Sequence, residues 1–320
     1  MIKSALLVLY FLFLQVGFIY SDIYFAGRGD SISAQVWDVK KNDIKNKKLL
    51  AMHGELFTVV KSKLGDVVYY GGALNNSGVV WERNLQSGEV KSFILPESRI
   101  IYALLSLKDG TIFAAGTHNY KGGYVWKKEY GKEWKKISRP PQATVITSLL
   151  VDNGKVFAGG FAKTDGKIWI FSDGEWNNGF ALNSSAEINT LIKSKEIIYA
   201  AGLKKNAQGG VWKFNGNSWQ EGTNLKFSHY IYASAVGKDG VVYLVGAGDE
   251  NKVLWENSQG FWNAVELDDC LAIYAIHVDQ NNYVYAAGWN KSRKGKFWLK
   301  KKKWNKGKDI KGCFVIRGIS

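Results

Sequence analysis

The residues FAGGFAKTDGKIWIFSDGEW, at positions 157–176, contain the pattern that decides the fold of this chain. An apolar strand ends in two glycines, a variable loop follows, and a tryptophan, Trp169, lies in a second apolar strand. The pattern recurs seven times, with the glycine-ending strand at residues 24–27, 69–72, 113–116, 157–160, 199–202, 243–246 and 285–288, and the tryptophan at Trp37, Trp81, Trp126, Trp169, Trp212, Trp255 and Trp298. A period of 43 to 45 residues indicates a repeat architecture.

Each period has room for four short strands. Another apolar strand precedes each glycine-ending strand, and turns such as Asp109-Gly110 and Asn153-Gly154 join the two; these dipeptides are strong hairpin signals. A second aromatic residue follows the repeat tryptophan after a polar turn at Trp134, Trp176, Trp219, Trp262 and Trp304, with Ile44 and Val90 in the first two repeats. Four-stranded units with this period are the blades of a propeller. We therefore predict an all-β, seven-bladed β-propeller.

The two ends of the chain are expected to meet in one blade. The first repeat has no room for an initial strand between residue 21 and its glycine, Gly27. The C-terminal residues 313–320 instead align with residues 270–277, which begin the last repeat. The C-terminal strand is thus predicted to complete the first blade and close the ring, leaving no open sheet edge between the first and last blades.

The order of apolar strand, Gly-Gly, loop, Val-Trp, turn and Trp resembles a degenerate kelch repeat of the exported bacterial type, over residues 22–320. The chain departs from that pattern in two ways: the double glycine is complete only at Gly71-Gly72 and Gly159-Gly160, and tryptophan stands where kelch repeats usually have tyrosine. The resemblance implies the fold and leaves the function open. Because exported kelch-like propellers include sugar mutarotases and epimerases, it also implies an alternative, a periplasmic sugar-active enzyme.

The N-terminal 21 residues have the pattern of a signal peptide. Lys3 gives a positive start, and an apolar run extends from Ala5 to Tyr20. We predict a signal peptide at residues 1–21, the propeller at 22–320, and a periplasmic or extracellular location. An uncleaved anchor is the alternative, because Ile19 is bulky for a position so close to the expected cleavage site.

Cys270 and Cys313 are the only cysteines. They occupy equivalent positions in neighbouring blades, near the start of the inner strands, and an exported protein permits oxidation. We predict a disulfide between them. The alternative is two unpaired thiols that replace the serines at the matching positions Ser98, Ser184 and Ser228.

Positive charge is concentrated in the last blade. Residues 291–311 contain ten lysines and Arg293 against Asp309, out of a formal net charge of +15. We predict a polyanion patch at Lys300, Lys301, Lys302 and Lys303, suited to an acidic polysaccharide or an anionic envelope surface. A rim that only keeps the protein soluble is the alternative. No nucleic-acid-reading module is present, so nucleic acid is not an expected partner.

The chain shows no catalytic or metal-binding motif. The four histidines have no metal-ligand spacing, and there is no Cys-x-x-Cys motif or nucleophile elbow, so we expect no metal and no cofactor. His277 lies either beside the central channel or in the core.

The predicted function is a protein- or glycan-binding interaction platform, most simply a monomer. Propellers bind ligands with the loops around one mouth of the central channel. On this chain those loops supply a candidate ligand site made of Glu97, Arg99, His229, Tyr230, Asp268, Asp269 and Trp289, with Glu187 nearby. Within this set, Glu97, Arg99 and His229 would be the residues of the alternative enzyme.

Overall fold

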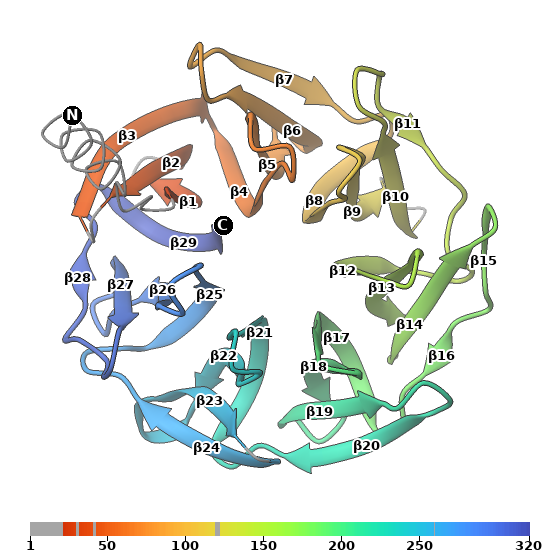
Figure 1. Cartoon of the computed structure of the whole chain (residues 1–320), viewed down its shortest axis with the longest axis vertical. Helices are drawn as coiled ribbons and strands as arrows, with labels where there is room; N and C mark the ends of the chain where they lie inside the picture. The colour runs from red at the N-terminus through yellow and green to blue at the C-terminus, as the bar shows by residue number, and fades with distance from the viewer. Residues whose placement is uncertain (1–21, 30–31, 41–42, 119–121, 259) are drawn as a thin grey trace, which may run out of the picture.

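The computed structural model describes residues 22–29, 32–40, 43–118, 122–258 and 260–320. These residues form seven antiparallel sheets around one axis, which confirms the predicted seven-bladed β-propeller (Figure 1). A short 3-10 turn, Asp249–Asn251, is the one helical element of this part of the chain. No described helix is long and apolar enough to cross a membrane. The predicted signal peptide lies outside the described residues.

The inner strand of each blade lines the central channel. In blade order these strands are β29 (Cys313–Ile319), β4 (Gly54–Lys61), β8 (Ser98–Ser106), β12 (Val145–Asp152), β17 (Ser185–Ser194), β21 (Ser228–Val236) and β25 (Ala272–Val278). The second strands carry the repeat glycine and are β1 (Ile23–Gly29), β5 (Val67–Leu74), β9 (Ile112–His118), β13 (Lys155–Ala162), β18 (Ile197–Lys204), β22 (Val242–Gly248) and β26 (Val284–Trp289). We call the blades one to seven, beginning with the blade that contains β1.

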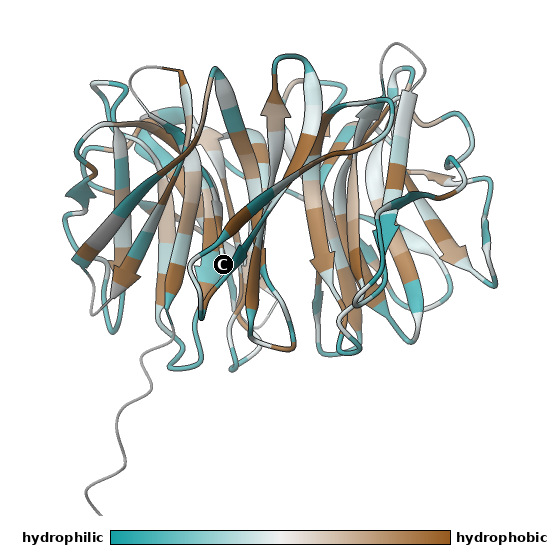
Figure 2. Cartoon of the chain, turned by 90° about the horizontal axis from the view of Figure 1, so that it is seen from above, coloured by the Kyte–Doolittle hydropathy of each residue, from teal (hydrophilic) through white to brown (hydrophobic). Residues whose placement is uncertain are grey.

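The third and outer strands complete each blade. The third strands carry the repeat tryptophan and are β2 (Ser33–Lys40), β6 (Ser77–Asn84), β10 (Gly122–Lys128), β14 (Asp165–Ser172), β19 (Gly209–Phe214), β23 (Lys252–Ser258) and β27 (Gly295–Lys300). The outer strands are β3 (Asp43–Met52), β7 (Val90–Ile94), β11 (Lys135–Lys136), β15 (Glu175–Trp176) with β16 (Phe180–Ala181), β20 (Trp219–Asn224), β24 (Phe261–Glu266) and β28 (Lys308–Asp309). Figure 2 shows hydrophobic bands within the strands and hydrophilic residues in the loops of both faces.

The C-terminal strand closes the ring as predicted. Blade one has the order β29-β1-β2-β3, and β29 pairs antiparallel with β1 from Phe25 opposite Ile319 to Gly29 opposite Cys313. Figure 1 shows blue β29 beside red β1. A hydrophobic cluster joins blade seven to blade one through residues such as Phe297 and Trp37, so the closing interface is packed like the others.

The seven repeat tryptophans pack the blades against one another. Each is less than 2% exposed, which confirms their structural role. In blades three to seven the indole N–H also donates to a main-chain carbonyl of the segment that enters the same blade; Trp169, for example, donates to Pro141 at 2.9 Å. A buried indole needs such a partner, and a phenylalanine at this position would leave the carbonyl without this donor.

The predicted disulfide is wrong, because Cys270 and Cys313 are two buried thiols that are not joined. The Cys270 thiol is directed at the Trp289 carbonyl of blade seven, at 3.8 Å, and the Cys313 thiol at the Arg28 carbonyl of blade one, at 3.9 Å. The alternative interpretation, two thiols that replace serines, holds with one change: the matching serine of blade five is Ser185, not Ser184. The hydroxyls of Ser185 and Ser98 each donate to a glycine carbonyl of the neighbouring blade.

Candidate binding site at the channel mouth

A β-bulge interrupts every inner strand at the same position. Pairing with the second strand skips one residue, as between Leu56 and Thr58 in β4. The skipped residues are Phe57, Tyr102, Thr147, Asn189, Tyr232, Tyr274 and Arg317. Bulges are known to re-aim side chains at functional sites. Here all seven side chains line the channel, and we call them the bulge ring.

The repeat glycine is what permits the bulge. A Cβ atom on Gly27, Gly72, Gly116, Gly160, Gly202, Gly246 or Gly288 would lie 1.7 to 2.1 Å from a main-chain carbonyl oxygen of the inner strand. No side chain tolerates that approach, and the bulged backbone cannot easily withdraw. The glycine that identifies the repeat in the sequence therefore exists because the inner strand comes so close.

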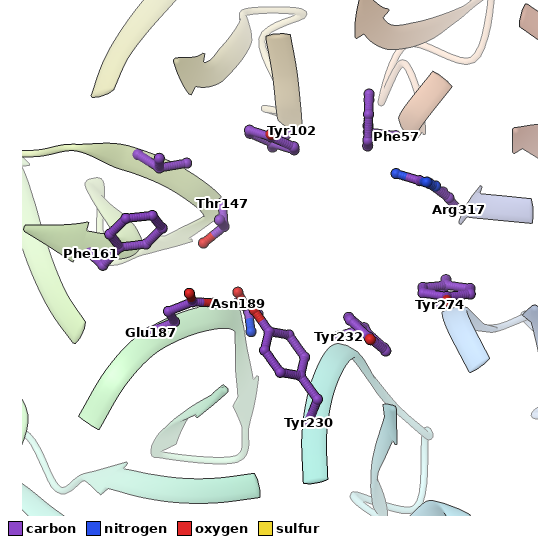
Figure 3. A pocket seen from close by; sticks show the side chains of 11 residues that line it. Phe57, Tyr102, Thr147, Phe161, Glu187, Asn189, Tyr230, Tyr232, Tyr274 and Arg317 are labelled. Atoms are coloured by element: carbon purple, nitrogen blue, oxygen red, sulfur yellow. Dashed lines mark hydrogen bonds between the residues drawn. The ribbon is translucent and has the colours of Figure 1, made fainter. Parts of the chain in front are cut away.

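The bulge ring surrounds a cavity of about 380 Å³ on the propeller axis (Figure 3). Val145, Phe161, Glu187 and Tyr230 complete its lining, and we call this cavity the mouth. A second space of about 260 Å³ continues along the channel, lined by the bulge-ring residues and the two that follow each of them. The mouth falls within the range of small-ligand sites, roughly 300–1,000 Å³.

Aromatic rings form most of one wall of the mouth. The rings of Tyr230 and Tyr232 lie 4.7 Å apart, those of Tyr232 and Tyr274 also 4.7 Å, and Phe57 meets Tyr102 edge to face at 5.1 Å. Burial raises the pKa of Tyr230, and its hydrogen bond to Glu187 raises that pKa further. The Tyr230 phenol thus stays protonated and donates to the Glu187 carboxylate.

The cationic group of the mouth is Arg317, which reaches the axis between Phe57 and Tyr274 (Figure 3). Its guanidinium carbon lies 4.7 Å from the Phe57 ring centroid and 6.0 Å from that of Tyr274. One amino group lies 2.9 Å from the Glu55 carboxylate, and Arg28 lies 3.9 Å from the same oxygen. Two guanidinium groups share one carboxylate, so this side of the mouth has an excess positive charge.

Hydrogen-bond acceptors face the mouth from blade five. Glu187 and Asn189 come from the same strand, β17, two residues apart. The Asn189 amide nitrogen donates to the Ile231 carbonyl at 3.0 Å, which leaves the amide oxygen to accept. The mouth therefore has a positive side, made by blade one, and an accepting side, made by blade five.

Tyr230 lines the mouth as predicted, and so does Glu187, which was expected nearby; the other members of the predicted ligand site are not among the lining residues. Glu97 belongs to blade three, where it pairs with Lys136 and, at 2.8 Å, with His118; these hydrogen bonds, Lys136 first, lower the pKa of Glu97 to about 2. Arg99 is exposed in the same blade. His229 pairs with Asp249 in blade six at 2.7 Å. Glu97, Arg99 and His229 therefore do not gather at the mouth.

The remaining predicted ligand residues belong to blade seven. Asp269 pairs with Lys296 at 2.7 Å, and this hydrogen bond lowers the pKa of Asp269. The Asp268 carbonyl accepts from Trp298 at 3.0 Å. Trp289 is partly buried between Tyr274 and Phe314, with ring centroids 5.2 and 5.4 Å away. Trp289 supports the mouth from behind.

The predicted polyanion patch loses one of its four lysines. Lys300 bonds to both carboxylate oxygens of Glu256 in blade six, each at 2.7 Å, and is partly buried. Lys301, Lys302 and Lys303 are exposed in the turn between β27 and β28. The exposed part of the patch is this turn, which we call the lysine turn.

Sequence analysis missed all seven bulge-ring residues. Side chains of a regular strand alternate between its two faces, and a bulge shifts this alternation by one residue. The sequence of an inner strand does not show where the bulge lies, so the residues that face the channel could not be predicted from it. The usable signal was the repeat glycine itself, 13 to 15 residues after the bulge position in six repeats. Among the described residues, no group of His, Cys, Asp and Glu side chains is arranged to hold a metal ion.

The fold and the mouth together define a seven-bladed β-propeller with a ligand-sized cavity on its axis. No protein-family model matches the chain, and no curated protein matches its sequence. One similar solved structure is described as a nidogen/laminin complex; the match has a TM-score of 0.55 and 12% identity, and covers 93% of this chain and 97% of the other. At this identity the likeness shows the fold alone.

Proposed function

We propose that this protein is an exported interaction platform that binds a glycan or protein ligand at the mouth. The observation that carries the proposal is the bulge ring. Seven equivalent backbone positions present Phe, Tyr, Thr, Asn and Arg side chains, and this mixture is polar, aromatic and asymmetric. A ring that only filled the channel would need neither a cation on one side nor acceptors on the other. Concave sites with aromatic walls and a few placed polar groups are typical of ligand binding.

Binding is favoured over catalysis by how the polar groups are held. Glu187 is the one carboxylate that lines the mouth, and it accepts from Tyr230, whose raised pKa keeps it from acting as a base near neutral pH. The residues of the alternative sugar-active enzyme, Glu97 and His229, are paired inside separate blades. Binding needs no such proton donor and acceptor pair.

The N-terminal sequence supports export, and one comparison supports a protein ligand. The charged start and apolar run of residues 1–21 support a periplasmic or extracellular location. The similar structure described as a nidogen/laminin complex is that of a propeller-containing assembly, which supports protein as one ligand class. The kelch-like pattern supports the same class of exported propeller.

The test is a binding screen of the purified chain on glycan and peptide arrays, with Tyr274→Ala as the mouth variant. Phe261→Ala is a matched control, because Phe261 is 75% exposed on the outer strand of blade six. We expect ligands whose signal falls at least tenfold in Tyr274→Ala and is unchanged in Phe261→Ala. Equal loss in both variants, or steady interconversion of sugar anomers or epimers by the wild type in an NMR assay, would overturn the proposal.

The lysine turn is proposed as a second contact, for an anionic surface. Its three exposed ammonium groups are screened over about 8 Å at physiological ionic strength, so binding should weaken steeply with salt. Replacing Lys301, Lys302 and Lys303 by glutamine should lower retention on heparin resin more than replacing Lys132, Lys135 and Lys155 of blades three and four. Equal losses would indicate that total charge alone governs retention.

A further inference from the structure

The two sides of the mouth favour different ligand groups. On the blade-one side, the Arg317 guanidinium carbon lies 4.7 Å from the Phe57 ring centroid and 6.0 Å from that of Tyr274, and two guanidinium groups share Glu55. An arginine fork fixed in this way suits a planar carboxylate, which can take two parallel hydrogen bonds. A ligand therefore gains most when it brings an anionic oxygen pair to Arg317.

The blade-five side of the mouth presents acceptors that favour uncharged hydrogen-bond donors. The Asn189 amide oxygen accepts, since its nitrogen is bonded to Ile231. Glu187 already receives the phenol hydrogen of Tyr230, which satisfies part of its carboxylate. Hydroxyl groups match both acceptors, and two neighbouring hydroxyls could use the two-residue spacing of Glu187 and Asn189 on β17.

Between the two sides lie aromatic surfaces and limited space. The tilted rings of Tyr230, Tyr232 and Tyr274 give a broad wall for the C–H face of a ring-shaped ligand. The volume of about 380 Å³ is near the lower end of the range for small-ligand sites, roughly 300–1,000 Å³. A compact ring with a carboxylate at one edge and hydroxyls at the other fits these constraints.

We propose that the mouth recognises a hexuronate, a sugar residue bearing a carboxylate, as part of an acidic glycan. The carboxylate binds Arg317, the hydroxyls donate to Glu187 and Asn189, and the ring lies along Tyr232 and Tyr274. This inference rests on the proposed function and names its ligand class. An acidic peptide would satisfy Arg317 but has no adjacent hydroxyls for blade five, so we assign the site to the sugar.

The experiment is calorimetric titration of the purified chain with trigalacturonate, a neutral galactose trisaccharide and a triaspartate peptide. The variants are Arg317→Gln, Arg317→Lys and the control Lys301→Gln, which removes the same charge from the lysine turn. We expect trigalacturonate to bind at least tenfold more tightly than the other two ligands. Arg317→Gln should lose at least tenfold in affinity for it, Arg317→Lys should recover only part, and Lys301→Gln should bind like wild type.

Several outcomes would overturn the inference. Equal affinity for the neutral trisaccharide would show that the carboxylate is not recognised, and equal affinity for triaspartate would show that the sugar is not. Equal weakening by Lys301→Gln would show that binding depends on total charge and not on Arg317. If trigalacturonate fails to bind while array ligands still depend on Tyr274, the inference fails and the proposed function stands. If no ligand depends on Tyr274, both fail. Thermal unfolding of Arg317→Gln shows whether the variant is folded.

Discussion

Two positions recur in all seven blades, and the sequence treats them in opposite ways. The third strand carries tryptophan every time, and each of these side chains is less than 2% exposed. The bulge position of the inner strand carries five different residue types. Both positions have the same backbone geometry from blade to blade, so the backbone does not explain the difference.

The surroundings of each position explain it. A tryptophan between two blades meets nearly the same surface seven times, so one side chain satisfies every interface. The bulge-ring side chains instead face the central channel. Packing there does not require the same large side chain in all seven blades. The residue type at the bulge position can therefore vary from blade to blade. Different residues on the two sides of the mouth can then contact different groups of one ligand. Four experiments test whether the tryptophan position is structural and the bulge position serves binding.

The largest effect is expected from deleting residues 313–320. The deletion removes β29, and with it the inner strand of blade one, Arg317, and one side of the packing between blades seven and one. Strand β1 would then have an unpaired edge, and the neighbouring blades would lose the apolar side chains of β29 that pack on them. We expect no cooperative thermal unfolding transition. A truncated chain that melts cooperatively at the wild-type temperature would show that the ring does not depend on its C-terminal strand.

Replacing one repeat tryptophan should cost more than replacing a bulge-ring aromatic. Trp169→Ala removes a fully buried side chain and its hydrogen bond to Pro141, which should lower the free energy of unfolding by about 3–5 kcal/mol. Tyr102→Ala removes a partly exposed ring and should cost less than half as much. Urea denaturation of both variants makes the comparison. Similar losses would mean that the bulge ring is as structural as the tryptophans.

A single methyl group tests the link between the glycine and the bulge. In Gly202→Ala the new Cβ would lie 2.1 Å from the Glu187 carbonyl oxygen, so β17 must move away. We expect a loss of about 1–3 kcal/mol in unfolding free energy, typical of overpacking, together with weaker ligand binding. Gly174→Ala is a control for an added methyl group, since no heavy atom lies within 4 Å of its Cβ position, although its φ of +86° adds strain. Unchanged binding in Gly202→Ala would separate the glycine from the site.

The smallest effect concerns His277, three residues after the bulge position of blade seven, where other blades have residues such as Leu105 and Leu150. Burial lowers the pKa of His277 to about 4, with Lys63 acting in the same direction and Asp279 against it. The unfolded chain gains this proton below about pH 6.5. The contribution of this residue to stability should therefore fall as the pH is lowered from 7 to 5.

Replacing His277 by leucine should flatten that dependence. We expect urea unfolding of His277→Leu to lose less stability between pH 7 and pH 5 than wild type, because leucine binds no proton in either state. His53→Gln is the control, since His53 is exposed. An identical pH dependence in wild type and His277→Leu would show that this histidine is not buried in its neutral form.

The strands, the blade count and the closure of the ring could be predicted because each depends on a pattern in the residue order. Glycine and tryptophan recur at fixed intervals. Residues 313–320 match the start of a repeat, which is the part that the first repeat, beginning at residue 22, lacks. The disulfide between Cys270 and Cys313 was wrong for a related reason. Equivalence in the repeat places two residues at the same height in adjacent blades, and it does not turn their thiols toward each other.

The architecture could be predicted from the residue order, since repeated burial of the same side chains repeats the same strands. The composition of the candidate site depends on how the chain folds. Phe57 and Arg317 are 260 positions apart, and their meeting depends on the closed ring. Which side chain of each inner strand faces the axis depends on a bulge, a backbone irregularity of one residue that side-chain alternation does not reveal. The ion pairs of Glu97, His229 and Lys300 also depend on folding, because their partners Lys136, Asp249 and Glu256 are distant in the sequence.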